Sequence, residues 1–271
     1  MIVYLFDNTL DGLLTAVFDS FFRHQQPDYL LTERLRAGEH GSGMGMQLPL
    51  FAEEIYEVKT NSEKAERVWK GLEKQLSKEG LQMITLSWLS EECSLNQPLF
   101  NFICKVFRLK VKDLERNASD PDVLEVRNSC RRVLHEQLRM KQFIRFQKAK
   151  DGTYLAVVSP NHNVLPLIIS HFKDRFNDQP WLIYDAKRHY GYYYDGEAAP
   201  IRVTFEDEAT VPFDLSNGKL DTEMLSENDK LFQDLWRTYF KAICIKERMN
   251  PKKQLSDMPR RYWKYMTEKN G

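Results

Sequence analysis

Basic and aromatic side chains occur together in two segments of the chain, and this combination suits contact with nucleic acid. The segments are residues 127–145 and residues 259–265, the second with the sequence PRRYWKY. Lysine and arginine neutralise phosphates, and an aromatic face can stack on a base. Both segments therefore predict nucleic-acid contacts.

In the first segment, the predicted contacts are Arg139, Lys141, Phe143 and Arg145. A predicted helix ends near residue 140, and the chain then becomes extended. A period of two places Lys141, Phe143 and Arg145 on one face, and this row of two cations and one ring could follow a nucleic-acid strand. The alternative is that Phe143 belongs to the core and that the arginines are solvated or paired with acids.

In the second segment, the predicted contacts are Arg260, Arg261, Trp263 and Lys264. Pro259 is typical of the first turn of a helix. On such a helix the cations can contact phosphates while Trp263 stacks on a base or wedges between bases. The alternative is a terminal helix that packs on the protein and whose charges are only solvated.

Two further predicted contacts, Arg175 and Arg188, lie between these segments, close to polar side chains that could act as acid or base. Asp185 ends a predicted strand, where functional side chains often lie. His171 and, on the preceding long helix, His135 are the other candidates for an acid or base. The alternative, which we favour, is a structural Asp–Arg pair with a histidine at the surface.

The spacing of the relevant residues excludes several other kinds of site. The four cysteines form no CxxC pair, and His135-Glu-x-x-Arg139 has an arginine where a zinc-protease helix needs its second histidine. The glycines at 38, 41, 43 and 45 lack the Gly-Lys-Ser/Thr ending of a phosphate-binding loop. The three-cysteine motif of radical enzymes is also absent. We therefore predict no metal and no cofactor bound by this chain.

Charge is distributed unevenly along a chain of zero formal net charge. Residues 127–150 carry eight Lys and Arg against one Glu, and residues 241–271 carry nine against three acids. Residues 206–234 carry nine acids against two lysines. Zero net charge excludes a global attraction to polyanions, so nucleic-acid binding has to be local.

The composition is typical of a globular protein in a reducing compartment. The chain has 271 residues, of which 42% are hydrophobic and 29% charged. Its scattered cysteines do not form a disulfide framework. No basic region precedes the apolar residues 2–6, and no apolar stretch approaches the ~20 residues of a membrane span. We therefore predict a cytoplasmic protein without membrane contact.

Apolar periodicity predicts an α+β protein in which mixed or antiparallel sheet elements pack with several amphipathic helices. Strands are predicted at residues 2–6, 55–59, 143–147, 153–158, 181–184, 190–194 and 201–205. Helices are predicted from residue 8 or 9 to Pro27 and at residues 62–78, 81–89, 98–107, 121–140 and 164–176. A further helix is predicted to start at Ser226-x-x-Asp229 and to run to about residue 249, and a short terminal helix is predicted from residue 259.

A domain boundary is predicted at residues 117–122, where the sequence NASDPD gathers turn-forming residues and a proline. It divides an N-terminal portion, residues 1–116, from a C-terminal portion, residues 117–271. The two portions could also pack as one unit.

Local sequence signals also predict a helix cap, a hairpin turn and a buried helix face. Gly80 is expected to cap the helix at residues 62–78, and Asp151-Gly152 is a hairpin turn signal. The helix that is predicted to start at Ser226-x-x-Asp229 is expected to bury an apolar face formed by Phe232, Leu235, Trp236, Tyr239, Phe240 and Ile243.

Six motifs resemble those of one bacterial family, and together they extend over nearly the whole chain. They are YLFDNTLDGLLTAVF at residues 4–18, HxxxRMKxFIRF at 135–146, PxHNVL at 160–165, HFxxRFxxQxWxIYD at 171–185, ERxNP at 247–251 and MPxRYWK at 258–264. The family is functionally uncharacterised and is linked to DNA metabolism or DNA repair. Its members accompany a radical S-adenosylmethionine protein, and a related domain occurs fused to uracil-DNA-glycosylase-like domains.

The resemblance implies a role with DNA beside a radical S-adenosylmethionine partner, and it assigns no catalytic residue. Three functions follow as hypotheses. The first, which we favour, is an accessory protein that binds DNA and presents it to the partner. The second is an enzyme that acts on a DNA base or nucleotide. The third is an interaction module that stabilises the partner without touching DNA, with the acidic residues 206–234 as its docking surface.

Overall fold

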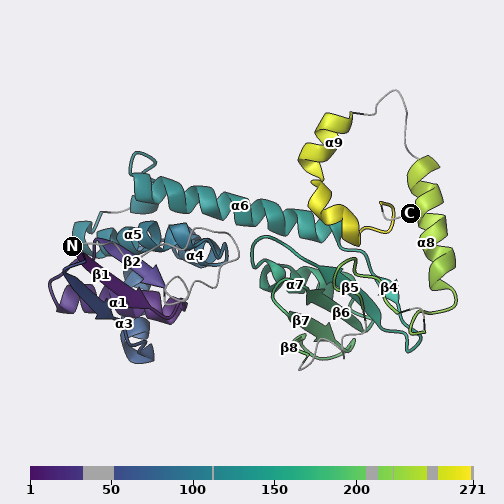
Figure 1. Ribbon diagram of the computed structural model, residues 1–271, viewed down its shortest axis with the longest axis horizontal. Helices are drawn as coiled ribbons and strands as arrows, with labels where there is room; N and C mark the ends of the chain where they lie inside the picture. The colour runs from purple at the N-terminus through teal and green to yellow at the C-terminus, as the bar shows by residue number, and fades with distance from the viewer. Residues whose placement is uncertain (33–51, 112, 206–212, 222, 243–249, 270–271) are drawn as a thin grey trace. The chain divides into compact units, whose positions relative to one another are not determined.

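The computed structural model describes residues 1–32, 52–111, 113–205, 213–221, 223–242 and 250–269. The contacts within the chain separate two units, Met1–Leu134 and His135–Gly271. The division falls within the long helix α6 (Pro121–Phe143), so one continuous helix contributes residues to both units (Figure 1). The boundary predicted at residues 117–122 lies at the start of this helix.

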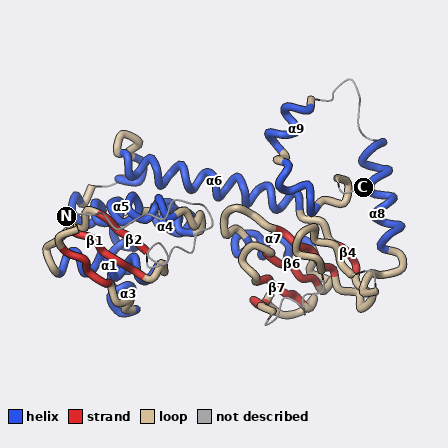
Figure 2. The backbone as a smooth tube through the Cα atoms, in the orientation of Figure 1, coloured by secondary structure: helices blue, strands red, loops and turns tan. Residues whose placement is uncertain are grey.

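Each unit combines helices with a β-sheet, which confirms the predicted α+β class (Figure 2). The sheet of the first unit has the strand order β2-β1-β3 and is parallel throughout. β1 (Ile2–Phe6) lies between β2 (Tyr29–Thr32) and β3 (Glu54–Glu57). The buried apolar run of β1 is typical of a central parallel strand, and the strand predicted there is confirmed.

The helices of the first unit are α1 (Leu10–Phe22), α3 (Ser62–Gln75), α4 (Lys78–Trp88) and α5 (Asn96–Leu109), with short 3-10 turns η1 (Cys93–Leu95) and η2 (Leu114–Arg116). α1 begins as predicted, because the Thr9 hydroxyl accepts a hydrogen bond of 2.9 Å from the backbone N–H of Gly12. The prediction that Gly80 caps α3 is wrong. The Ser77 hydroxyl accepts a hydrogen bond of 3.1 Å from the Gly80 N–H, so Gly80 belongs to the first turn of α4.

The sheet of the second unit is mixed and has the strand order β4-β5-β6-β7-β8. Its strands are β4 (Gln147–Lys148), β5 (Tyr154–Val158), β6 (Trp181–Asp185), β7 (Tyr190–Tyr194) and β8 (Ile201–Val203). β5 and β6 are parallel and are connected through α7 (Leu165–Arg175), whereas the other neighbours are antiparallel. The predicted hairpin between β4 and β5 is confirmed, and Gly152 in its turn has a φ of 90°, which favours glycine.

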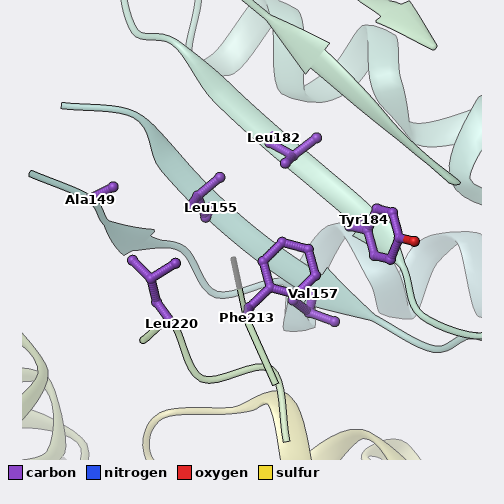
Figure 3. Close-up of a cluster of buried hydrophobic side chains, with 7 residues drawn as sticks. All are labelled: Ala149, Leu155, Val157, Leu182, Tyr184, Phe213 and Leu220. Carbon is purple, nitrogen blue, oxygen red and sulfur yellow. The ribbon is translucent and has the colours of Figure 1, made fainter. Parts of the chain in front are cut away.

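One face of this sheet packs on an apolar cluster (Figure 3). The cluster consists of Ala149, Leu155, Val157, Leu182, Tyr184, Phe213 and Leu220. Its members from β5 and β6 lie two residues apart along each strand, so they point to the same side of the sheet. The period of two in the sequence therefore places these side chains in the core.

β7 approaches β6 closely at Gly191, which pairs with Tyr184 across the sheet. A Cβ atom at position 191 would lie 2.6 Å from the carbonyl oxygen of Ile183. This separation is too short for any side chain, so glycine is required for the observed spacing of the two strands.

α6 continues through Phe143, so the extended conformation predicted from this residue is wrong. Phe143 is buried, and its ring centroid lies 5.6 Å from that of Tyr262. This packing favours almost one further turn of helix beyond the predicted end at residue 140. Lys141 and Phe143 are consequently helical, and they do not share the face of a strand with Arg145.

The C-terminal part contains α8 (Asp229–Ala242), α9 (Pro251–Asp257) and the 3-10 helix η5 (Arg260–Tyr265). The predicted burial of α8 is wrong for its described side chains, since Phe232, Leu235, Trp236 and Tyr239 are 65%, 55%, 39% and 55% exposed. The Phe240 side chain, Ile243 and the helix end predicted near residue 249 lie outside the described residues. Clustered exposed apolar side chains of this kind often mark an interaction surface.

Candidate functional site

A cleft of about 430 Å³ lies in the second unit, between the end of α6, the end of α7, α8 and the C-terminal segment. Its lining residues are Gln142, Arg145, Phe146, Arg175, Asp229, Phe232, Gln233, Trp236 and Thr267. The lining thus combines two arginines with three aromatic rings. These are the side-chain types that the sequence predicts for nucleic-acid contact, so we define these residues as the basic–aromatic cleft.

Arg145 lies in the cleft with its charge compensated by an acid. Its Nη2 and Nε atoms donate to the two carboxylate oxygens of Glu268 at 2.7 and 3.3 Å, and the indole N–H of Trp236 donates to the same carboxylate at 3.1 Å. Burial raises the pKa of Glu268, but the hydrogen bonds from Arg145 and Trp236 outweigh burial, so this pKa is lowered. The buried carboxylate therefore holds Arg145 and Trp236 in place.

Arg175 is the exposed cation of the cleft, and its guanidinium lies 5.6 Å from the centroid of the Phe176 ring. Burial and then the positive charges of Lys141 and Arg175 lower the pKa of His171. The charges of two predicted contacts, Lys141 and Arg175, thus both act on His171, and the charge of Asp174 acts against them. Asp229 is the acid of the lining, and its carboxylate accepts a hydrogen bond of 2.8 Å from the backbone N–H of Lys148.

A second, smaller pocket of about 140 Å³ shares Phe146 with the cleft. It is lined by Phe146, Tyr154, Phe176, Gln179 and Trp181. The rings of Phe146 and Phe176 meet edge to face, with centroids 5.5 Å apart and planes at 72°. We call this space the aromatic pocket. Its walls come from the amino ends of β5 and β6, from the segment between α7 and β6, and from Phe146 between α6 and β4.

The predicted contacts near the C-terminus pack on their own segment. Trp263 is half-buried, and its indole N–H donates a hydrogen bond of 3.0 Å to the carbonyl oxygen of Met258. Arg260 lies 5.9 Å from the Trp263 ring, and Lys264 lies 4.6 Å from the ring of Tyr265. This arrangement resembles the docked terminal helix of the alternative interpretation more closely than a surface that presents its rings to bases.

Residues 94–268 match the model of a protein family described as a domain of unknown function, DUF4130. This match extends over more than half of the chain. The chain belongs to the DUF4130 family. The matched region includes all the residues that line the basic–aromatic cleft and the aromatic pocket.

Comparisons with curated proteins and with solved structures give no further information about function. A search of curated proteins finds no match for the chain. Among solved structures, a pGpG-specific phosphodiesterase, PggH from Vibrio cholerae, aligns over 89% of this chain and 98% of its own, with 9% sequence identity and a TM-score of 0.30. Similarity at this level supports no conclusion about the function of this DUF4130 protein.

Glu136 is a buried carboxylate that the sequence predictions did not include among the site residues. It accepts hydrogen bonds from the backbone N–H groups of Asn161 at 3.0 Å and His162 at 2.9 Å, and from the Tyr262 hydroxyl at 2.8 Å. Arg261, a predicted nucleic-acid contact, lies at 3.4 Å from the same carboxylate. Burial raises the pKa of Glu136, but these hydrogen bonds outweigh burial and lower it. Its position as the lone acid within the basic residues 127–150 is the signal that could have revealed it.

Asp185 and Arg188 form a buried ion pair of 2.7 Å at the carboxyl end of β6. The carboxylate also accepts a hydrogen bond of 2.9 Å from the backbone N–H of Lys187, and Arg188 donates to the carbonyl oxygens of Pro160 at 3.1 Å and Asn161 at 2.9 Å. Burial raises the pKa of Asp185, although Arg188 acts to lower it. These contacts hold the loop between β5 and α7, as expected of a structural Asp–Arg pair.

The structure gathers some of the predicted contacts and separates others. Arg145 and Arg175 line one cleft, and Lys141 is not among its lining residues, whereas Arg188 lies at the other end of β6 from the aromatic pocket. Arg139 donates a hydrogen bond of 3.1 Å to the carbonyl oxygen of Ser256 in α9.

His135 is an exposed residue of α6. In the described part of the chain, no three His, Cys, Asp or Glu residues group as metal ligands would. None of the described helices has the length and apolar character needed to cross a bilayer.

Proposed function

We propose that this DUF4130 protein binds nucleic acid along the basic–aromatic cleft and acts as an accessory factor that presents DNA to a partner enzyme. The observation that carries the proposal is the convergence of Arg145 and Arg175 with the rings of Phe146, Phe232 and Trp236 on one space. Cations contact phosphates and rings stack on bases, so one cleft supplies both kinds of contact.

The charges of the cleft determine which side chains attract phosphate and how strongly binding depends on salt. Glu268 compensates Arg145, so the attraction for phosphate comes mainly from Arg175, the exposed cation of the lining. Phe232 and Trp236 expose large parts of their rings and supply stacking area. A site with few uncompensated cations binds with a shallow salt dependence, and stacking supplies the remaining affinity.

The partner belongs to the proposal as well. The family resemblance suggests a radical S-adenosylmethionine protein as the enzyme that receives the DNA. A pure interaction module is the second candidate function, because the exposed apolar side chains of α8, among them Leu231, Leu235 and Tyr239, are suited to a protein partner. An enzyme that acts on a base is less favoured, because Asp185 is fully engaged with Arg188 and with backbone groups.

The test is fluorescence anisotropy of a labelled oligonucleotide, single-stranded or duplex, over a range of salt concentrations. The Arg175→Ala variant should bind roughly tenfold more weakly, equivalent to about 1.4 kcal/mol. The slope of log affinity against log salt should fall by about 0.7 for a single-strand phosphate contact. Lys150→Ala is the matched control, since Lys150 is an exposed cation near the β4–β5 turn and away from the cleft lining. Wild-type protein without affinity at low salt, alone or with the partner, would overturn the proposal.

A further inference from the structure

We propose that the aromatic pocket accepts one unpaired nucleobase of the bound strand. This inference rests on the proposed function, because the pocket would act on a strand already held in the basic–aromatic cleft. Phe146 lines both spaces, so a base entering the pocket would remain attached to a backbone lying in the cleft.

The walls of the pocket suit a flat aromatic group. Four of its five lining side chains are aromatic rings, and Phe146 and Phe176 stand edge to face at 72°. A planar ligand can therefore stack on one ring while its edge meets the other. Base–aromatic stacking is largely independent of sequence, so every base can make this contact.

The size of the pocket suits a single base. Its volume of about 140 Å³ is close to the ~150 Å³ of an apolar protein cavity that takes up one benzene molecule. That space holds one heteroaromatic base and is too small for a stacked or hydrogen-bonded pair of bases. The ligand would thus be a base that has left any duplex pairing.

One of the lining residues, Trp181, carries a buried polar group in need of a partner. Trp181 is 1% exposed, and its indole Nε1 has no hydrogen-bond partner among the described residues. An N–H group buried in this way is costly, and a carbonyl oxygen or ring nitrogen of a base is an acceptor of the right kind. The amide of Gln179, which also lines the pocket, can donate or accept at the edge of the base.

The position of the pocket places phosphate and base contacts next to each other. Tyr154 and Trp181 are register partners at the amino ends of β5 and β6, so the rigid sheet fixes two of the walls. Phe176 directly follows Arg175 in sequence, and the Arg175 guanidinium lies over its ring. A phosphate at Arg175 would therefore leave its base within reach of the pocket.

The experiment compares a short oligothymidylate with the same backbone made wholly of abasic nucleotides, both measured by anisotropy. Trp181→Phe removes the indole N–H and keeps a ring, and Gln179→Ala changes the pocket without touching the core. Either variant should bind oligothymidylate roughly tenfold more weakly than wild type and bind the abasic strand equally well. The salt dependence should stay unchanged, because no charge is removed. Tyr193→Phe, in β7 outside the pocket, is the control and should bind both strands as wild type does.

The outcomes separate the two proposals. If wild type prefers oligothymidylate and both pocket variants keep that preference, the pocket assignment is wrong and the cleft proposal stands. Equal binding of the two strands by wild type would overturn the pocket assignment and also the stacking role of the cleft rings, and it would leave only the phosphate contacts of the cleft. If Arg175→Ala weakens neither strand, or if wild type binds neither, the proposed function fails and the pocket assignment fails with it. Gln179→Ala decides the result if Trp181→Phe does not fold.

Discussion

The hydroxyl of Tyr262 donates a hydrogen bond of 2.8 Å to the buried carboxylate of Glu136. The two residues are 126 positions apart, so this bond ties the C-terminal 3-10 helix η5 to α6. The same carboxylate holds the loop that follows β5 through its backbone N–H groups. One side chain thus connects three segments of the second unit.

Tyr262→Phe should lower the free energy of unfolding by about 1.5–3 kcal/mol, the usual range for a hydrogen bond to a charged group. Urea denaturation followed by circular dichroism measures the change. Tyr193→Phe is the control, because Tyr193 is a partly buried tyrosine beside the apolar cluster, and its change should stay within about 0.5 kcal/mol. Equal losses in the two variants would show that the bond to Glu136 contributes nothing specific.

Alkaline pH should remove this contribution. Burial, followed by the negative charge of Glu136, raises the pKa of Tyr262 to about 12, whereas an unfolded tyrosine titrates near ~10. Because the folded pKa is the higher one, the stabilisation is complete below pH ~10 and is lost as pH rises toward 12. The difference in unfolding free energy between wild type and Tyr262→Phe should therefore shrink over this range. A constant difference would contradict the assignment.

Acid should remove the contribution of Glu268. Its pKa is lowered in the folded protein, and an unfolded glutamate titrates near ~4.3, so its stabilisation is present above that pH and is lost as pH falls through the lower, folded value. Glu268→Gln should cost up to about 3–5 kcal/mol at neutral pH, because Arg145 loses its buried partner. The cost should decline below pH ~4. Glu125→Gln, at an exposed position of α6, should show a small difference that does not vary with pH.

Asp185→Asn should destabilise the protein by about 3–5 kcal/mol, because Arg188 is left buried without its counter-charge. Oligonucleotide affinity of the folded variant should match that of wild type, since the pair lies outside the cleft. Asp174→Asn, at an exposed position of α7, is the control for removal of a charge. Wild-type stability combined with the loss of a reaction on DNA would instead favour Asp185 as a catalytic residue.

Thiol labelling should distinguish the cysteines of the first unit. Burial raises the pKa of both Cys104 and Cys130 to about 11, so neither forms much thiolate at neutral pH. Cys93 is partly exposed. In a Cys244→Ser background, a disulfide reagent should label Cys93 in the native protein, and the other two only after denaturant is added. Rapid native labelling of Cys104 would contradict the burial of its thiol.

Regular elements of the second unit could be predicted because their signals are local. Asp151-Gly152 specifies the hairpin, the alternation along residues 153–158 gives β5, and Pro121 starts α6. The end of α6 could not be predicted, because Phe143 packs on Tyr262, which lies more than a hundred residues away. The burial of α8 could not be predicted either, since an amphipathic pattern does not show whether its apolar face has a partner.

The candidate site was only partly predictable, because it depends on contacts between residues that are far apart in the sequence. Arg145 and Arg175 were selected by charge, and they do line one cleft. Their neighbours could not be assigned in advance, because the pairing of Arg145 with Glu268 depends on how the C-terminal segment folds back. The aromatic pocket was missed because Phe146, Phe176 and Trp181 look like ordinary core residues in the sequence. Only their packing shows that space is left between them.

Gly191 has a consequence for future mutational surveys of this chain. Any larger residue there would push β7 away from the carbonyl of Ile183, so a saturation library selected for any property that requires folding should return glycine alone. Such intolerance resembles that of an active-site residue, and Gly191 is close in sequence to Asp185 and Arg188. A measurement of folding distinguishes a structural glycine from a binding residue. Substitution of Gly191 should abolish folded protein, whereas substitution of a residue that contacts a ligand should abolish binding and leave the protein folded.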